Sequence, residues 1–296
     1  MNREAEILGA ADYSEKIEYG QSSLVLIVNN RLKEHNCMFG FVVLKNDFDE
    51  AKGLFEAAER RARELGFREL IGPLNYNTWM SYRWALNRYD VKYFPDCENE
   101  AYHVDFIRRL GYSELYTYRS AHVKLDNALF GMSEGVYRQK LDEGFTFRFV
   151  SNDEAFALAG EIFDLCRDAF AGGILYSEIR RGEFETIYLS QLKAIDGVEM
   201  IAAFDGGEPA GFSMGYVDPF DRRHYISKTT AVRKKYQHQR LYLALLYLGY
   251  RHIRELGYND VVYHYECEQR PTFHRFDGGV ESNEKRYAVF KKELEA

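Results

Sequence analysis

The sequence lacks the features that mark metal-bound, disulfide-stapled and membrane-spanning proteins. Its four cysteines, Cys37, Cys97, Cys166 and Cys267, are far apart and none forms a C-x-x-C pair, so we expect free thiols and neither a metal site nor disulfides. The longest uncharged apolar run, residues 241–250, is much shorter than the roughly 20 residues that span a bilayer. We therefore expect no contact with a membrane.

A positive net charge is also missing. The chain has 39 basic and 46 acidic residues, for a net charge of −7 and an isoelectric point near 5.7. A general nucleic-acid footprint is excluded on this basis, and any basic patch must be local. Residues 1–11 carry alternating charges without the apolar core of a signal peptide, which favours a cytoplasmic protein.

Aromatic residues, in contrast, are abundant. They make up 16% of the 296 residues, with 23 tyrosines and 21 phenylalanines. The length exceeds that of a usual single domain, and residues 125–144 combine three glycines with mixed polarity. We therefore predict two domains, covering residues 1–140 and 145–296.

The first half shows the alternation of strand and helix signals expected of an α+β unit. Residues 23–29 and 37–44 read as a hairpin, and Asp47 can cap a helix that ends at Gly66. The other predicted elements are a strand at 69–71, an ordered aromatic loop at 76–100, a helix at 101–110 and a strand at 114–124.

The second half repeats this type of pattern. The predicted elements are a strand at 145–150, helices at 154–171 and 183–195, a hairpin at 198–204 and 209–218, a strand at 226–232, a helix from 241, a strand at 260–266, a short helix at 271–276 and a final strand at 284–291. The helix end at residues 63–67, Arg-Glu-Leu-Gly-Phe, recurs at 254–258 as Arg-Glu-Leu-Gly-Tyr. This echo indicates a duplicated unit.

Residues 226–246 form the most informative stretch, a strand followed by a basic loop and an apolar helix. Such an arrangement directs free backbone N–H groups, the positive end of a helix dipole and cationic side chains towards one point. We expect a phosphate-bearing ligand there.

Together, these residues resemble the GNAT superfamily of acyl-CoA N-acyltransferases, and specifically its bacterial tandem-domain proteins. The matching segments are the hairpin 204–212, the strand–loop–helix 226–246, the helix end at 254–257 and, in the first half, Gly72-Pro73-Leu74-Asn75. The resemblance implies two GNAT-type domains, each with a mixed, mostly antiparallel twisted sheet flanked by helices. It also implies that the second domain binds acetyl-CoA or another acyl-CoA and that the first is non-catalytic.

The family's phosphate-binding signature, R/Q-x-x-G-x-G/A, aligns with residues 237–242. Gln237 fits, whereas Arg240 and Tyr242 replace small residues that let the cofactor approach the backbone. We expect Arg240, Lys234 and Lys235 to offset this through ion pairs with phosphates. The residues implied in cofactor binding are Ala231, Val232, Lys234, Gln237, His238, Gln239, Arg240, Leu241, Tyr242 and, after the next strand, Gln269.

Direct acyl transfer requires a base for the amine and an acid for the departing thiolate. In the family this chemistry lies on the strand that corresponds to residues 261–268. We predict Glu266 as the base, with Glu268 as the second choice; the alternative for each, which exposed glutamates more often follow, is a solvated carboxylate at a strand end. Tyr265 and Tyr287 are the candidate acids, with His274 as a third option, since the usual tyrosine position has no equivalent. Period-two alternation predicts His264 and Glu266 on one face of the strand and Tyr265 on the other.

The expected acceptor is a small-molecule amine or an amino-acid-like compound. It would enter between the first helices of the second domain and the aromatic loop of the first. Residues that we expect to hold an amine are Asp168, Tyr176, Glu178 and Glu185, and those that would line an apolar group are Trp79, Tyr82 and Trp84. A homodimer is one assembly left open.

Two other functions remain open from the sequence. A transferase that uses aminoacyl-tRNA is disfavoured by the acidic net charge. A catalytically inactive tandem GNAT pair that acts as a ligand-binding or scaffold protein is favoured by Arg240, Tyr242 and the lack of an assigned acid.

Overall fold

The computed structural model describes residues 3–80, 82–189, 195, 197–269 and 284–295. The strands are β1 (Tyr13–Tyr19), β2 (Ser22–Val28), β3 (Cys37–Val43), β4 (Glu69–Gly72), β5 (Trp84–Ala85), β6 (Ser113–Lys124), β7 (Thr146–Val150), β8 (Glu199–Asp205), β9 (Glu208–Val217), β10 (Tyr225–Val232), β11 (Asp260–Cys267) and β12 (Lys285–Glu293). The helices are α1 (Arg3–Leu8), α2 (Phe48–Glu64), α3 (Ala101–Arg109), α4 (Ala128–Asp142), α5 (Asn152–Ala157), α6 (Ala159–Phe170), α7 (Arg181–Glu183), the π-helix η1 (Phe184–Leu189), the 3-10 helix η2 (Lys234–Tyr236) and α9 (Leu241–Glu255).

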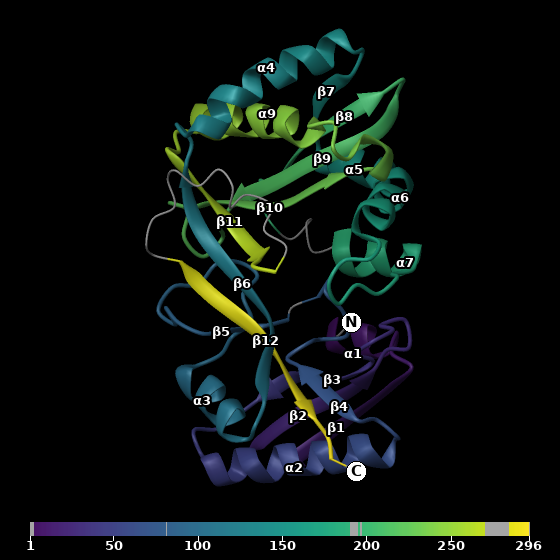
Figure 1. Cartoon of the computed structure of the whole chain (residues 1–296), viewed down its shortest axis with the longest axis vertical. Helices are drawn as coiled ribbons and strands as arrows, with labels where there is room; N and C mark the ends of the chain where they lie inside the picture. The colour runs from purple at the N-terminus through teal and green to yellow at the C-terminus, as the bar shows by residue number, and fades with distance from the viewer. Residues whose placement is uncertain (1–2, 81, 190–194, 196, 270–283, 296) are drawn as a thin grey trace.

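All strands join one continuous sheet in the order β1-β2-β3-β4-β12-β6-β11-β10-β9-β8-β7, and β5 pairs with β12. The molecule is elongated, with the β1 end in the lower half of Figure 1 and the β7 end in the upper half. Most strand pairs are antiparallel; the parallel pairs are β3 with β4 and β10 with β11. The predicted α+β class with a mostly antiparallel twisted sheet is confirmed.

Each half contains the same succession of a hairpin, a helix and a strand that returns parallel to the previous one. In the first half α2 connects β3 to β4, and in the second half α9 connects β10 to β11. The similar sequences at residues 63–67 and 254–258 therefore lie at equivalent places, where α2 and α9 end.

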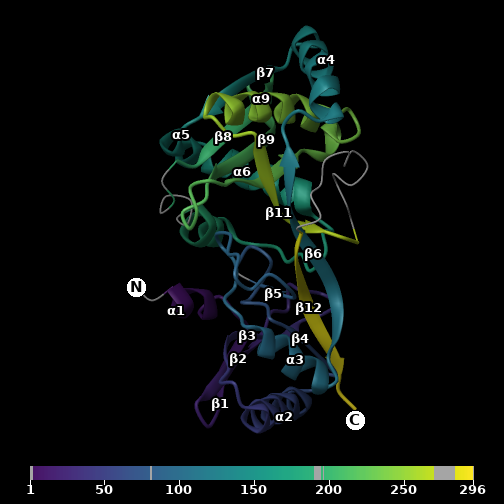
Figure 2. The same ribbon diagram turned by 90° about the vertical axis from the view of Figure 1, so that its left-hand side faces the viewer.

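Helices cover both faces of the sheet in the second half. Alternate residues of β8 point to opposite sides, so Met200 packs in the same cluster as Ile162 of α6, and Ile201 in the same cluster as Leu245 of α9. The turned view in Figure 2 shows α9 and α6 on the two sides of β8 and β9.

In the first half, α2 covers one face of the sheet. It begins after Asp47, whose side chain accepts hydrogen bonds from the N–H groups of Asp49 and Glu50, as the predicted cap requires. Its apolar stripe includes Leu54 and Phe55, both fully buried against the sheet. The opposite face is covered by α1 and by the aromatic segment that follows β4.

The last strand, β12, lies in the middle of the sheet, between β4 and β6. Its residues Ala288 and Phe290 belong to the same buried cluster as Leu24, Phe39 and Phe55. Thus the last strand of the second half of the chain completes the core of the first half. The boundary between residues 140 and 145 stays a prediction.

Three local expectations are corrected. Residues 125–144 contain helix α4, which starts after the capping side chain of Asn127 and packs against α9. Strand β1, which alternates between half-buried and exposed residues, was not predicted. The helix predicted for residues 154–171 is interrupted at Leu158, giving α5 and α6. The short helix predicted at 271–276, including His274, lies outside the described residues.

Candidate active site

The candidate site lies where β10 and β11 diverge. These parallel strands pair only at Ile226 with Val262 and at Ser227 with Tyr263. Beyond that point β10 continues along β9 as far as Val232, and β11 continues along β6 as far as Cys267. The sheet therefore opens into a wedge between the two strand ends.

Two adjoining cavities, of about 660 and 650 Å³, occupy this wedge and its surroundings. The first lies on the side of the aromatic segment 78–95, and we call it the aromatic lobe. The second lies on the side of loop 236–242, and we call it the loop lobe. Both are lined by Lys228, Thr229, Gln237, His264 and Tyr265, so the two cavities adjoin at these residues.

Both strands carry a bulge at the point of divergence. The register between β10 and β9 shifts between Ser227 and Thr229, which makes Lys228 the additional residue. The register between β11 and β6 shifts between Tyr263 and Glu266, and Tyr265 has a φ of 65°. The predicted alternation along β11 is therefore wrong at this point: His264 and Tyr265 stack on each other with ring centroids 3.6 Å apart and line the same cavity.

The basic loop between β10 and α9 has an unusual backbone. His238 and Arg240 have φ values of 66° and 61°, the left-handed conformation that favours glycine. Arg240 is also the residue that precedes the first turn of α9. The backbone thus takes a path suited to glycine although side chains with a Cβ occupy it.

Most of the residues predicted to bind the cofactor line the loop lobe. They are Ala231, Val232, Gln237, His238, Arg240, Leu241 and Tyr242, and Lys234 lines the aromatic lobe instead. The Gln237 side chain donates to the Val232 carbonyl at 3.0 Å and fixes the loop to the end of β10.

Two predicted cofactor residues lie apart from both lobes. Gln239 donates to the carbonyl of Lys235. Gln269 binds Thr117 of β6 through both ends of its amide, accepting from the backbone N–H and donating to the hydroxyl. Neither side chain therefore lines either lobe of the site.

The two candidate bases are both ion-paired. Glu266 lines the loop lobe, and its Oε2 lies 2.9 Å from Nε of Arg119, where both side chains are 8% exposed. Glu268 pairs with Arg286 at 2.9 Å and lines neither lobe. Burial would raise the pKa of Glu268, but hydrogen bonds from Arg286 and Thr117 outweigh it and lower that pKa.

The two candidate acids differ in position. Tyr265 lines both lobes and donates its hydroxyl to Oδ1 of Asp96 at 2.8 Å. Tyr287 is 1% exposed and lies behind Tyr265, where its hydroxyl accepts from Ser120. Burial, and then the charge of Asp96, raises the pKa of each tyrosine well above its ordinary value. Only Tyr265 meets the cavity.

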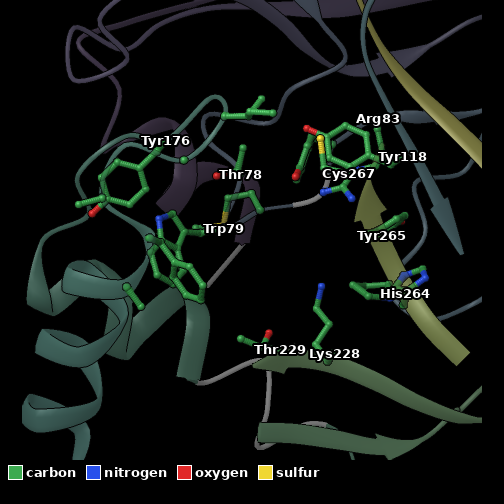
Figure 3. Close-up of a pocket in the computed structure, with 18 of the residues that line it drawn as sticks. Thr78, Trp79, Arg83, Tyr118, Tyr176, Lys228, Thr229, His264, Tyr265 and Cys267 are labelled. Atoms are coloured by element: carbon green, nitrogen blue, oxygen red, sulfur yellow. The ribbon is translucent and has the colours of Figure 1, made fainter. Parts of the chain in front are cut away.

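The aromatic lobe contains two cationic residues that the sequence prediction missed. Arg83 is 4% exposed, and its guanidinium lies over the rings of Tyr82, Tyr118 and Tyr265 at 3.5, 4.1 and 3.7 Å from their centroids. Figure 3 shows the Lys228 side chain rising from β10 into the open space on whose far side Arg83 lies. Burial, and then the charge of Arg83, lowers the pKa of Lys228 to about 8.

A buried polar network supports the wall formed by β11. His264 Nδ1 and Ser120 Oγ are 2.8 Å apart, and Asp96 is held by the ammonium of Lys285 at 2.7 Å as well as by Tyr265. Burial, and then repulsion from Lys228, lowers the pKa of His264 well below its ordinary value, so the ring is neutral at physiological pH. Asp96 was not predicted either, and nothing in the sequence distinguishes it from the neighbouring acidic residues Asp90, Glu98 and Glu100.

Of the residues predicted on the acceptor side, Trp79, Tyr82 and Tyr176 line the aromatic lobe. The others do not line it: Trp84 is buried in the core of the first half, Asp168 accepts from the N–H of Lys234, Glu185 pairs with Arg181, and Glu178 is exposed.

No family model and no curated protein matches the chain. Solved structures do match it. A tandem GNAT protein from the clavulanic acid biosynthesis pathway is similar over 93% of this chain and 79% of its own length, with a TM-score of 0.55 and 12% identity. A GCN5-related N-acetyltransferase from Sphaerobacter thermophilus covers 93% of this chain and 77% of its own, with a TM-score of 0.51 and 11% identity.

A glucosamine N-acetyltransferase region of a fungal multi-domain β-N-acetylglucosaminidase is similar over 99% of this chain, which spans 34% of that longer protein, with a TM-score of 0.54 and 11% identity. The chain has the tandem GNAT fold. The resemblance stated from the sequence is thus confirmed at the level of fold.

The two GNAT units differ in what occupies their wedge. In the first unit β3 and β4 pair only at Met38 with Ile71, but the chain after β4 fills the gap. Leu74 donates its N–H to the Phe39 carbonyl at 2.9 Å, and the Asn75 side chain accepts from the N–H of Phe41 at 2.8 Å. These are residues of the Gly-Pro-Leu-Asn segment noted in the sequence. The first unit's wedge is closed by its own backbone, and the second unit's is open.

Among the described residues, no helix is long and apolar enough to cross a membrane, and no group of three or more His, Cys, Asp or Glu side chains is arranged to hold a metal ion. All four cysteines are free thiols, of which Cys37 and Cys166 are buried.

Proposed function

We propose that the protein is an N-acyltransferase that moves an acyl group from acetyl-CoA or another acyl-CoA directly to the amine of a small molecule. The observation that carries this proposal is the open wedge between β10 and β11, which is continuous with a large cavity, beside a first unit whose own wedge is closed. We propose that the second unit carries the activity and that the first contributes a wall of the acceptor site.

The residues of the loop lobe fit an acyl-CoA. A pantetheine arm can lie between the diverging strands, where Ala231 and Val232 line the cavity. The left-handed backbone at His238 and Arg240 provides the path that glycines usually give to a phosphate-binding loop. The Arg240 guanidinium supplies charge for a phosphate group.

The acyl-CoA supplies a thioester, and the chain's own groups must move the protons. Glu266 is our proposed base because, unlike Glu268, it lines the cavity. The Arg119 guanidinium holds its carboxylate in place, with Nε 2.9 Å from Oε2. Tyr265 is our proposed acid because, unlike Tyr287, it lines both lobes.

Calorimetric titration with acetyl-CoA tests the proposal directly. We expect micromolar binding, roughly −8 kcal/mol. Arg240→Glu should weaken acetyl-CoA at least about tenfold, since it replaces attraction with repulsion at the phosphates. It should leave acetyl-pantetheine, which has no phosphate, unchanged. Lys52→Glu, on the exposed face of α2 in the first unit, is the matched control. No heat at millimolar acetyl-CoA would reject the proposal.

One observation favours a second candidate, an inactive tandem GNAT protein that only binds a ligand. Both predicted bases, Glu266 and Glu268, are engaged in ion pairs with arginines. Under this alternative the protein binds acetyl-CoA but releases no free CoA thiol with any amine. A thiol-release assay over a broad amine panel distinguishes the two.

A further inference from the structure

We propose that Arg83 and Lys228 bind a carboxylate of the acceptor, so that the substrate is an amine that also bears a carboxylate and a bulky apolar group, as in an aromatic or large aliphatic amino acid. This inference rests on the proposed function and specifies its second substrate.

The first argument is the hydrogen-bonding state of Arg83. Its Nε and Nη1 are buried and have no hydrogen-bond partner, and among the described residues no carboxylate forms an ion pair with it. Leaving a buried charged donor unsatisfied costs free energy that the fold alone does not recover. Three tyrosine rings lie against the guanidinium, and Arg83 is among the residues that line the aromatic lobe.

The second argument is the charge of the aromatic lobe. Arg83 and Lys228 both line it, Lys234 lies at its exposed side, and no Asp or Glu is found among the described residues that line it. The buried Arg83 and the half-buried Lys228 line one space, and desolvation of the ammonium, followed by the charge of Arg83, lowers the pKa of Lys228. An anion between them offsets the repulsion between the two cations and satisfies the donors.

The third argument concerns strain. Arg83 has a φ of 68°, and its N–H donates to the Pro73 carbonyl at 3.1 Å. A non-glycine residue in this conformation costs about 1–2 kcal/mol. Strained positions that the surrounding structure maintains are concentrated at ligand sites. Here the strain places a guanidinium in the cavity.

The choice of a carboxylate and of an apolar body follows from the rest of the lining. A guanidinium edge matches a planar carboxylate in a two-point contact. Several of the other lining residues carry aromatic rings, among them Trp79, Phe94, Phe170, Tyr176 and Tyr216. Such walls favour a ring or a branched aliphatic chain over a sugar or a polyamine.

The test compares each amino acid with the amine that lacks only its carboxylate: phenylalanine with phenethylamine, tryptophan with tryptamine, and leucine with isoamylamine. Acetyl transfer is followed by release of the CoA thiol. We expect kcat/KM to favour the amino acids by about 100-fold, because a buried polar site left unpaired rejects the analogue. The 1-aminoalkylphosphonate analogue of phenylalanine separates a carboxylate site from a general oxyanion site, and equal use of it would overturn the carboxylate assignment.

Arg83→Met should reduce this preference to near unity while leaving the affinity for acetyl-CoA within about twofold, and Arg83→Lys should restore part of it. Arg83→Met loses contacts with three tyrosine rings but no ion pair among the described residues, so we expect it to lower the melting temperature only slightly. Arg119→Met, which removes a buried arginine paired with Glu266, should lower it more. Lys228→Met provides a second test of the preference should Arg83→Met fold poorly.

The outcomes separate the two proposals. If acetyl-CoA does not bind, the proposed function fails, and calorimetry with phenylalanine alone, in wild type and Arg83→Met, still tests the anion site. If acetyl-CoA binds and the decarboxylated amines are used equally well, only the acceptor inference fails. A loss of acetyl-CoA affinity in Arg83→Met with unchanged acceptor preference would place Arg83 in the donor site and overturn the inference.

Discussion

Arg83 and Lys228 both occupy positions where a cation costs free energy of desolvation. Each is a cation in a largely buried setting, and each lies in a segment otherwise rich in aromatic or β-branched residues. Evolutionary replacement by methionine or leucine would remove the desolvation cost of both. Their presence at one cavity is therefore better explained by a ligand than by the stability of the fold.

The pKa of Lys228 leads to a prediction about ligand binding. It is lowered to about 8, so the ammonium is charged below that pH and neutral above it. The charged or titratable groups nearest to it are Arg83, Asp96, His264 and Tyr265. Binding of an anion at Lys228 should raise this pKa, and each unit of the rise corresponds to a tenfold change in affinity.

We therefore expect the affinity for 3-phenylpropanoate to fall about tenfold between about pH 7 and pH 9.5, since its own carboxyl is ionised throughout this range. Titration calorimetry at stepped pH measures it. In Lys228→Met the affinity should be lower at pH 7 and independent of pH. A wild-type affinity that does not change across pH 8 would show that Lys228 does not contact the anion.

Glu266 carries a second prediction at this scale. Glu266→Gln keeps the shape of the side chain and its contact with Arg119 but cannot accept a proton. We expect kcat to fall by about 10²–10⁴ with little change in the KM for acetyl-CoA. Glu64→Gln, at an exposed position of α2, serves as the control. Unchanged kcat in Glu266→Gln would transfer the role of base to another group.

At the scale of elements, the loop from β10 to α9 separates what the sequence can show from what it cannot. The strand, basic loop and helix were predicted at the right places because their periodicity is local. The left-handed backbone at His238 and Arg240 was not predicted, because no glycine marks it. The bulge at His264 and Tyr265 was missed for a related reason: alternation is assumed to continue until a glycine or proline interrupts it.

The conformation of Arg240 gives a prediction of stability. Arg240→Gly should be more stable than Arg240→Ala by about 1 kcal/mol, because only glycine adopts a positive φ without strain. The order should reverse at Arg251, an exposed interior position of α9, where glycine is less stable than alanine by about 1 kcal/mol. Urea denaturation of the four variants measures both differences. If the glycine variant is less stable than the alanine variant at both positions, Arg240 is not left-handed in solution.

At the scale of the whole molecule, the position of β12 could not be read from the sequence. A final strand was predicted at residues 284–291, and it exists, but pairing partners far apart in the chain leave no local signal. The site residues show the same limit. Glu266 and Tyr265 were predicted from one strand and its resemblance, whereas Arg83 and Asp96 come from the other half of the chain and lie near β11 only because of the fold.

Because β12 lies beside β4, we expect a substitution near the C-terminal end of β12 to destabilise the first unit. Phe290 is fully buried in a cluster with Phe39 and Trp84, so Phe290→Ala should cost about 3–5 kcal/mol. Hydrogen exchange should quicken most in β2, β3 and β4. Phe220→Ala, at a position that is 58% exposed, should change stability by at most about 0.5 kcal/mol. Faster exchange confined to β8–β10 would contradict the topology.

The central position of β12 also has a consequence for the order in which the nascent chain acquires structure. Units near the N-terminus usually fold while later residues are still being synthesised. Here β4 and β6 have no partner between them until β12 has left the ribosome, after the second GNAT unit. Until then both strands present unpaired edges, the kind of surface through which chains aggregate. The same strand that joins the two halves into one sheet therefore leaves the growing chain with unpaired edges, and so open to aggregation, until synthesis is nearly complete.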